Sequence, residues 1–96
     1  MGPNDAVSRR LEARVHRDFL GAEADAVLAR LAGLRLAMAD KQSTERIHAA
    51  VVFLAAGDLE KFDYAVWCAE TDWRDVLVAS SLSSGWVARL DEELGA

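Results

Sequence analysis

Every residue from Ile47 to Ala56 except His48 is apolar, and the run stops at Gly57. A helix that is apolar on all sides has no face to turn toward water, so other elements must surround it. We therefore expect a buried central helix here, with Ser43 as its N-cap and Gly57 as the left-handed residue after its last turn.

The rest of the chain also has a helical pattern. Alanine and leucine are abundant, and the single proline lies near the N-terminus, as is typical of helical proteins. Apolar residues recur every three or four positions and predict five further helices, over residues 5–16 or 5–19, 22–38, 59–70, 73–80 and 86–94. We expect an all-α fold, a compact bundle of five or six short antiparallel helices with HEAT-like or orthogonal packing. Residues 1–96 form one helical domain in this prediction, with residues 1–5 and 95–96 frayed.

Charge and composition exclude several classes of protein. The net charge is −5, and the excess lies in residues 36–96, which carry eleven acidic side chains against five basic ones. An acidic body repels phosphate backbones, so we expect no nucleic-acid partner. The one cysteine, Cys68, excludes an intramolecular disulfide and a zinc site built from cysteines. With no basic-then-apolar leader and no apolar stretch of about 20 residues, we expect a cytoplasmic protein without membrane contact.

The predicted helix over residues 59–70 carries the most informative surface. Its core stripe consists of Leu59, Phe62, Val66 and Ala69. Tyr64 and Trp67 fall on the opposite, polar side together with Glu60, which is unexpected if that side meets only water. Either other helices or the N-terminal arm cover the two rings, or the rings form a protein interface, because Trp and Tyr are frequent in binding hot spots. The second interpretation predicts a non-enzymatic interaction module that binds a protein partner or forms a homodimer.

An acidic cluster near the end of that helix gives an alternative function. Its members are Asp63, Glu70, Asp72 and Asp75. They would line the pocket of a small ligand-binding or metal-binding domain, or of an enzyme. Capping and the helix dipole explain carboxylates at a helix start more simply, with Asp72 as the N-cap of the helix over residues 73–80.

Three arginines form a stripe opposite the apolar side of the first predicted helix: Arg10, Arg14 and Arg17. One interpretation is contact with an anion or with an acidic partner. The other is a solvated face, with Glu12 and Asp18 nearby to balance the charge.

No motif for nucleophilic catalysis, phosphate binding or dinucleotide binding occurs in the chain. Its serines lie mainly at predicted helix ends, where capping explains them. Glu45 and His48 have the Glu-x-x-His spacing of di-iron bundles, but the second pair that such a site needs is missing. We interpret His48 as a histidine at the edge of the core and predict no catalytic residue, no metal and no cofactor.

Residues 45–47 read Glu-Arg-Ile, residues 54–59 read Leu-Ala-Ala-Gly-Asp-Leu, and residues 72–79 read Asp-Trp-Arg-Asp-Val-Leu-Val-Ala. These segments resemble a family of small uncharacterised actinobacterial helical proteins, over most of residues 44–94. The resemblance implies an actinobacterial source and a similar size. It brings no activity, cofactor or site residue to this chain.

Overall fold

The computed structural model describes residues 7–34, 41–82 and 84–95, and within them the chain forms six helices and no strand. The helices are α1 (Arg9–Asp18), α2 (Ala22–Ala32), α3 (Lys41–Ala55), α4 (Leu59–Thr71), α5 (Trp73–Ala79) and α6 (Trp86–Leu94). They form one compact globule with dimensions of 32 × 29 × 25 Å. The prediction of an all-α fold with five or six short helices is confirmed.

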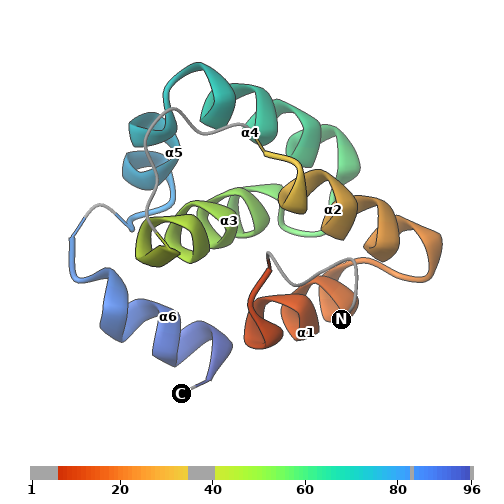
Figure 1. The fold of residues 1–96 in the computed structure, drawn as a ribbon, viewed down its shortest axis with the longest axis horizontal. Coiled ribbons are helices and arrows are strands. Elements are labelled where there is room, and N and C mark those ends of the chain that lie inside the picture. The colour runs from red at the N-terminus through yellow and green to blue at the C-terminus, as the bar shows by residue number, and fades with distance from the viewer. Residues whose placement is uncertain (1–6, 35–40, 83, 96) are drawn as a thin grey trace.

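Helix α3 passes through the middle of the molecule, with α4 and α5 on one side and α1 and α6 on the other (Figure 1). Its buried side chains point in all directions around the helix axis: Ile47, His48, Ala49, Ala50, Val51, Val52 and Ala55. The predicted buried central helix is therefore confirmed. Small alanines alternate with branched residues along it, so neighbouring helices approach it closely on several sides.

Several predicted helix ends need correction. Helix α1 begins at Arg9, because the Ser8 side chain accepts a hydrogen bond from the Leu11 N–H and caps the helix there. Helix α3 begins at Lys41, so Ser43 lies inside the helix and is not its N-cap. Lysine and glutamine are good helix formers, and a polar stretch containing them extends a helix as readily as it ends one. Helix α2 ends at Ala32 with Gly33 as its C-cap, so the expected continuation to about residue 38 is wrong, and the glycine ends the helix early. The expected starting point of α1 near residue 5 lies outside the described residues.

Two aspartates connect the helices on one side of α3, and the N-cap predicted at Asp72 is confirmed. The Asp58 carboxylate accepts hydrogen bonds from the N–H groups of Glu60 and Lys61 and starts α4. Asp72 ends α4 through its own N–H, which donates to the Cys68 carbonyl, and starts α5 by accepting the Arg74 N–H. Because one residue serves both helices, the chain turns sharply here, and α5 leaves α4 at a steep angle (Figure 1).

Helix α6 is attached to the body by the buried Leu90, by the partly buried Trp86 and Leu94, which pack against the core, and by polar contacts. Arg46 on α3 donates a hydrogen bond of 2.7 Å to the Leu82 carbonyl, and its guanidinium lies 5.1 Å from the centre of the Trp86 ring. Gly95, which we expected to be frayed, accepts a hydrogen bond from Arg10. In the described part of the chain, no helix has the length and hydropathy needed to cross a bilayer.

Gly57 gives a test of how the α3–α4 turn is built. Its φ is +81°, as predicted, and a Cβ at this position would lie 3.1 Å from the Asp18 carbonyl oxygen. We expect Gly57→Ala to lower the free energy of unfolding by about 1–2 kcal/mol, because an L-residue is strained at positive φ. Gly33→Ala is the control, since φ is −94° there and the new Cβ would make only an ordinary 3.5 Å contact.

The measurement is urea denaturation followed by tryptophan fluorescence. Gly33→Ala is expected to change the stability by less than about 1 kcal/mol, and in the stabilising direction if at all. Equal losses in the two variants would show that the left-handed turn at Gly57 is not a constraint on the fold.

Candidate functional site

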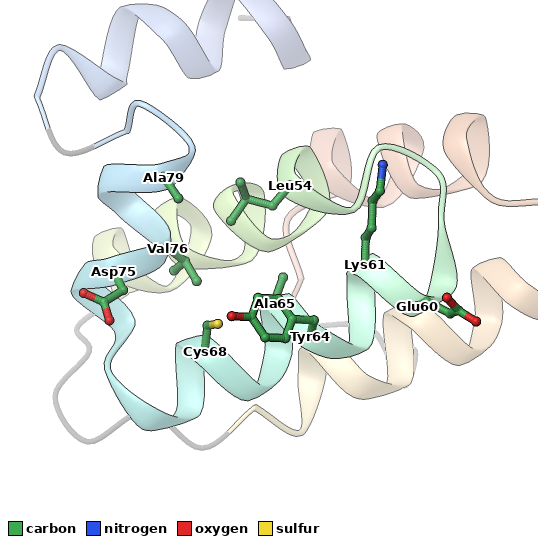
Figure 2. Close-up of a pocket in the computed structure, with 9 residues that line it drawn as sticks. All are labelled: Leu54, Glu60, Lys61, Tyr64, Ala65, Cys68, Asp75, Val76 and Ala79. Atoms are coloured by element: carbon green, nitrogen blue, oxygen red, sulfur yellow. The ribbon is translucent and has the colours of Figure 1, made fainter.

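A groove of about 570 Å³ lies between α4 and α5, with the end of α3 as its floor (Figure 2). Its lining residues are Leu54, Glu60, Lys61, Tyr64, Ala65, Cys68, Asp75, Val76 and Ala79. Leu54 comes from α3, and Asp75, Val76 and Ala79 come from α5. The other five lining residues come from α4. The apolar side chains of three helices thus converge on one open space.

The groove exists because α4 and α5 diverge from the turn at Asp72 and because small residues line them. Ala65 on α4 and Ala79 on α5 leave space that larger side chains would fill. Leu54 is only partly buried on α3 and closes the floor. A large side chain at the exposed Ala79 would therefore reach into the groove, whereas Ala65 is buried in the core.

Tyr64 and Trp67 stand at the edge of this groove and are exposed, with 67% and 61% of their surface accessible. Their ring centres are 6.0 Å apart and their planes are inclined by 25°, an offset stack. The described helices cover neither ring, so the interpretation in which the C-terminal helices bury them is wrong. The N-terminal arm, the other candidate for covering them, lies outside the described residues. Tyr64 turns toward the groove (Figure 2), and the aromatic pair extends the apolar surface onto the outside of α4.

The Tyr64 hydroxyl points toward the sulfur of Cys68, one turn further along α4 (Figure 2). Interaction with this thiol raises the pKa of Tyr64 above its ordinary value of 10. The phenol therefore stays neutral. Cys68 is a partly buried free thiol whose side chain faces the same space (Figure 2).

Two carboxylates mark the rim of the groove, Glu60 on α4 and Asp75 on α5, and both are exposed. Lys61 is the basic side chain in the lining. Glu60 was predicted to accompany the aromatic pair, and it lies on the same helix face as Tyr64, one turn earlier.

The acidic cluster does not converge on a pocket. Of its four members only Asp75 lines the groove. Asp72 is a helix cap and forms an ion pair with Arg74, which holds the pKa of Asp72 below its ordinary value. Within residues 7–34, 44–82 and 84–95, no three His, Cys, Asp or Glu side chains lie together so as to hold a metal ion. The arrangement supports the capping interpretation for Asp72, and Asp75 lies in the first turn of α5, where the helix dipole favours an acid.

The arginine stripe is mostly occupied by contacts within the chain. Arg10 binds Glu45 with two parallel hydrogen bonds, from Nη2 at 2.8 Å and from Nε at 2.9 Å, and its Nη1 lies 2.7 Å from Asp91. This guanidinium joins α1, α3 and α6. The hydrogen bonds from Arg10, together with one from the Ser8 hydroxyl, hold the pKa of Glu45 below its ordinary value.

Arg14 is engaged in the same way. It pairs with Asp18 at 3.0 Å and with Glu93 of α6 at 3.5 Å, and it lies 5.0 Å from the centre of the Phe53 ring. Arg17 is exposed at the end of α1. Because two of the three arginines already have carboxylate partners, the stripe serves mainly to hold helices together, and we do not propose an anion site there.

His48 lies in the core, with 2% of its surface exposed. It hydrogen-bonds the Leu31 carbonyl of α2, while its Nδ1 has no partner among the described residues. Burial lowers the pKa of His48 to about 4, against the opposing effects of the Leu31 carbonyl and of Glu45. A neutral imidazole enclosed in this way links α2 to α3 and has no access to a substrate.

The sequence missed part of the groove. Tyr64, Trp67 and Glu60 were predicted from the polar side of one helix. Cys68 was not predicted to join them, although its spacing of four residues from Tyr64 could have indicated it. Val76 and Ala79 carried no signal for a groove, and Val76 is buried in the core as well as lining it. Their place in the groove depends on the angle between α4 and α5, which no local pattern encodes.

Comparison with protein-family models, with curated proteins and with solved structures finds no match to this chain. The resemblance to small actinobacterial proteins therefore stays a prediction. Function has to be argued from the groove and its rim.

Arg10 gives a test of the contacts that join three helices. We expect Arg10→Ala to lower the free energy of unfolding by about 1–2 kcal/mol, because the partly buried Glu45 carboxylate then loses its cationic partner and keeps only the hydrogen bond from the Ser8 hydroxyl. Arg10→Lys should restore only part of this loss, since an ammonium cannot form the two parallel hydrogen bonds. Arg17→Ala is the control and should change the stability by less than about 0.5 kcal/mol. Urea denaturation measures all three, and similar values for Arg10→Ala and Arg17→Ala would contradict the assignment.

His48 predicts a pH dependence of stability. Its pKa is about 4 in the folded protein and 6.5 as the ordinary value, so between these values the unfolded chain binds a proton that the folded protein does not. The contribution of neutral His48 to the free energy of unfolding is therefore fully present above about pH 6.5. It is lost as the pH falls from 6.5 toward 4, with a slope approaching about 1.4 kcal/mol per pH unit.

The measurement is urea denaturation between about pH 7 and pH 5, above the range where carboxylates titrate. His48→Gln should remove this slope, while His16→Gln, at an exposed position on α1, should keep it. A slope that survives in His48→Gln would assign the pH dependence to other groups.

Proposed function

We propose that this protein is a non-enzymatic interaction module that binds a protein partner through its aromatic face, the surface formed by Glu60, Tyr64 and Trp67 together with the adjoining groove. The observation that carries the proposal is the exposure of two stacked aromatic rings on a helix face that is otherwise polar. A cytoplasmic location is part of the proposal.

The chemistry of Tyr64 and Trp67 favours a role for the two exposed rings in binding a partner. Tyrosine and tryptophan supply large rigid contact areas at low cost in conformational entropy, so they dominate the energetics of many interfaces. Here Tyr64 and Trp67 stack on each other, so each ring restricts the other before any partner arrives. A preorganised apolar surface loses less entropy on binding than one made of mobile side chains.

The acidic alternative has less support. A ligand-binding or enzymatic site needs polar groups that converge on a pocket, and among Asp63, Glu70, Asp72 and Asp75 only one carboxylate faces the groove. The partner is then either a different protein or a second copy of this chain.

The first test is a selection of random peptides displayed on phage, about 16 residues long, against the whole protein. The variant Tyr64→Ala/Trp67→Ala removes both rings, and Leu20→Ala/Val87→Ala is the control, because it shortens two equally exposed apolar residues elsewhere. We expect peptides selected by the wild type to bind the first variant at least about tenfold more weakly and the control equally well. Circular dichroism checks that both variants are folded. If the selected peptides bind the ring-deficient variant as well as the wild type, the aromatic face is not the interface.

Light scattering over a range of concentrations identifies the kind of partner. A wild-type dimer that Trp67→Ala converts to a monomer would make the partner a second copy. A monomer in both proteins would leave a different protein as the partner.

A further inference from the structure

We infer that the groove between α4 and α5 accepts a short amphipathic helix that carries lysine or arginine beside its apolar stripe. The inference rests on the proposed function and names the chemistry of the partner. Three features of the described residues carry it: the shape of the groove, the aromatic pair beside it, and the charge of its rim.

The shape fits a helix that inserts apolar side chains. The wall from Glu60 to Cys68 spans about two turns of α4, or about 12 Å. The floor and the opposite wall are aliphatic, formed by Leu54, Val76 and Ala79 (Figure 2). A partner helix bound in such a groove uses anchors at positions i, i+3, i+4 and i+7, which together cover a similar length.

The aromatic pair favours an extended partner over a small molecule. Tyr64 contributes to the groove, whereas Trp67 stacks on it and lies outside the lining. A small ligand enclosed in the groove would leave Trp67 in water. A helix lying over the groove would also cover the ring beside it, so the partner that explains both features is a segment of protein.

The rim gives the charge of the partner. Glu60 and Asp75 stand on opposite walls, and residues 58–75 carry six acidic side chains against Lys61 and Arg74. Arg74 is paired with Asp72, which leaves Lys61 as the basic group in the groove lining. Complementary charge on a partner raises its association rate and selects against acidic competitors.

The same charges disfavour a second copy. A twofold-symmetric dimer through this face would place Glu60 and Asp75 against their own equivalents, because each patch meets itself in such an interface. Carboxylates of like charge would then repel across the contact. A head-to-tail contact with the basic side of α1 is also disfavoured, since Arg10 and Arg14 are paired within the chain.

Titration calorimetry with designed peptides tests the inference on the whole protein. The probe is a helix of roughly 16 residues with leucine at positions i, i+3, i+4 and i+7 and lysine on both flanks. One control peptide has glutamate in place of lysine, and another has the same composition in scrambled order. We expect the leucine–lysine helix to bind, more weakly as salt is raised from about 50 to about 200 mM, and the two control peptides to bind at least about tenfold more weakly.

Variants then locate the site. Ala79→Trp fills the groove from an exposed position and should weaken binding of the leucine–lysine helix at least about tenfold. Glu60→Gln/Asp75→Asn removes the rim charges and should weaken it at least about threefold. The matched control Glu23→Gln/Glu92→Gln makes the same change in net charge at exposed positions on α2 and α6 and should leave binding unchanged.

Three results would overturn the inference: no binding of the leucine–lysine helix, equal binding of the glutamate peptide, or equal effects of the two charge-removing variants. The charge variants keep the test valid even if Ala79→Trp fails to fold. Failure of the inference is distinct from failure of the proposed function. Phage-selected peptides that depend on Tyr64 and Trp67 but lack basic residues would leave the interaction module and remove only the cationic partner.

Discussion

The burial of α3 on all sides is the constraint on which the rest of the structure depends. Its side chains from Ile47 to Ala55 are almost all enclosed, and removing so much apolar surface from water supplies the main driving force for folding. One neighbour cannot enclose a helix, so α1, α4, α5 and α6 all contact it. The short lengths of the surrounding helices follow from this arrangement, because each only has to cover one side of α3.

The groove is a consequence of the same arrangement. Helices α4 and α5 both pack on α3, yet a single capping residue, Asp72, joins them and forces them apart at an angle. Two helices that diverge over a third leave a wedge of space, which small residues such as Ala65 and Ala79 do not fill. The site proposed for partner binding is therefore built from rigid elements, and its shape does not depend on loops.

Charge divides the molecule into two parts with different uses. On the side of α1 and α6, opposite charges meet: Arg10 and Arg14 bind carboxylates of three helices at short distances. On the side of α4 and α5, acidic groups such as Glu60 and Asp75 face solvent. The paired charges hold helices together, whereas the excess of acidic over basic groups on α4 and α5 produces the field that a partner meets. The difference explains why the arginine stripe, prominent in the sequence, is not the surface that we propose for binding.

The sequence by itself determined the helical fold, the buried position of residues 47–55, the caps at Asp58 and Asp72, and the polar side of α4 on which Tyr64 and Trp67 lie. These properties follow from periodicity and capping, which act over a few residues. Only the tertiary structure decided that the two rings stay exposed, that Arg10 closes onto Glu45, and that a groove forms between α4 and α5. These features join residues that are distant in the chain, and they depend on the angles at which helices pack around α3. An apolar stripe specifies which side of a helix is buried, but several packing angles satisfy the same stripe.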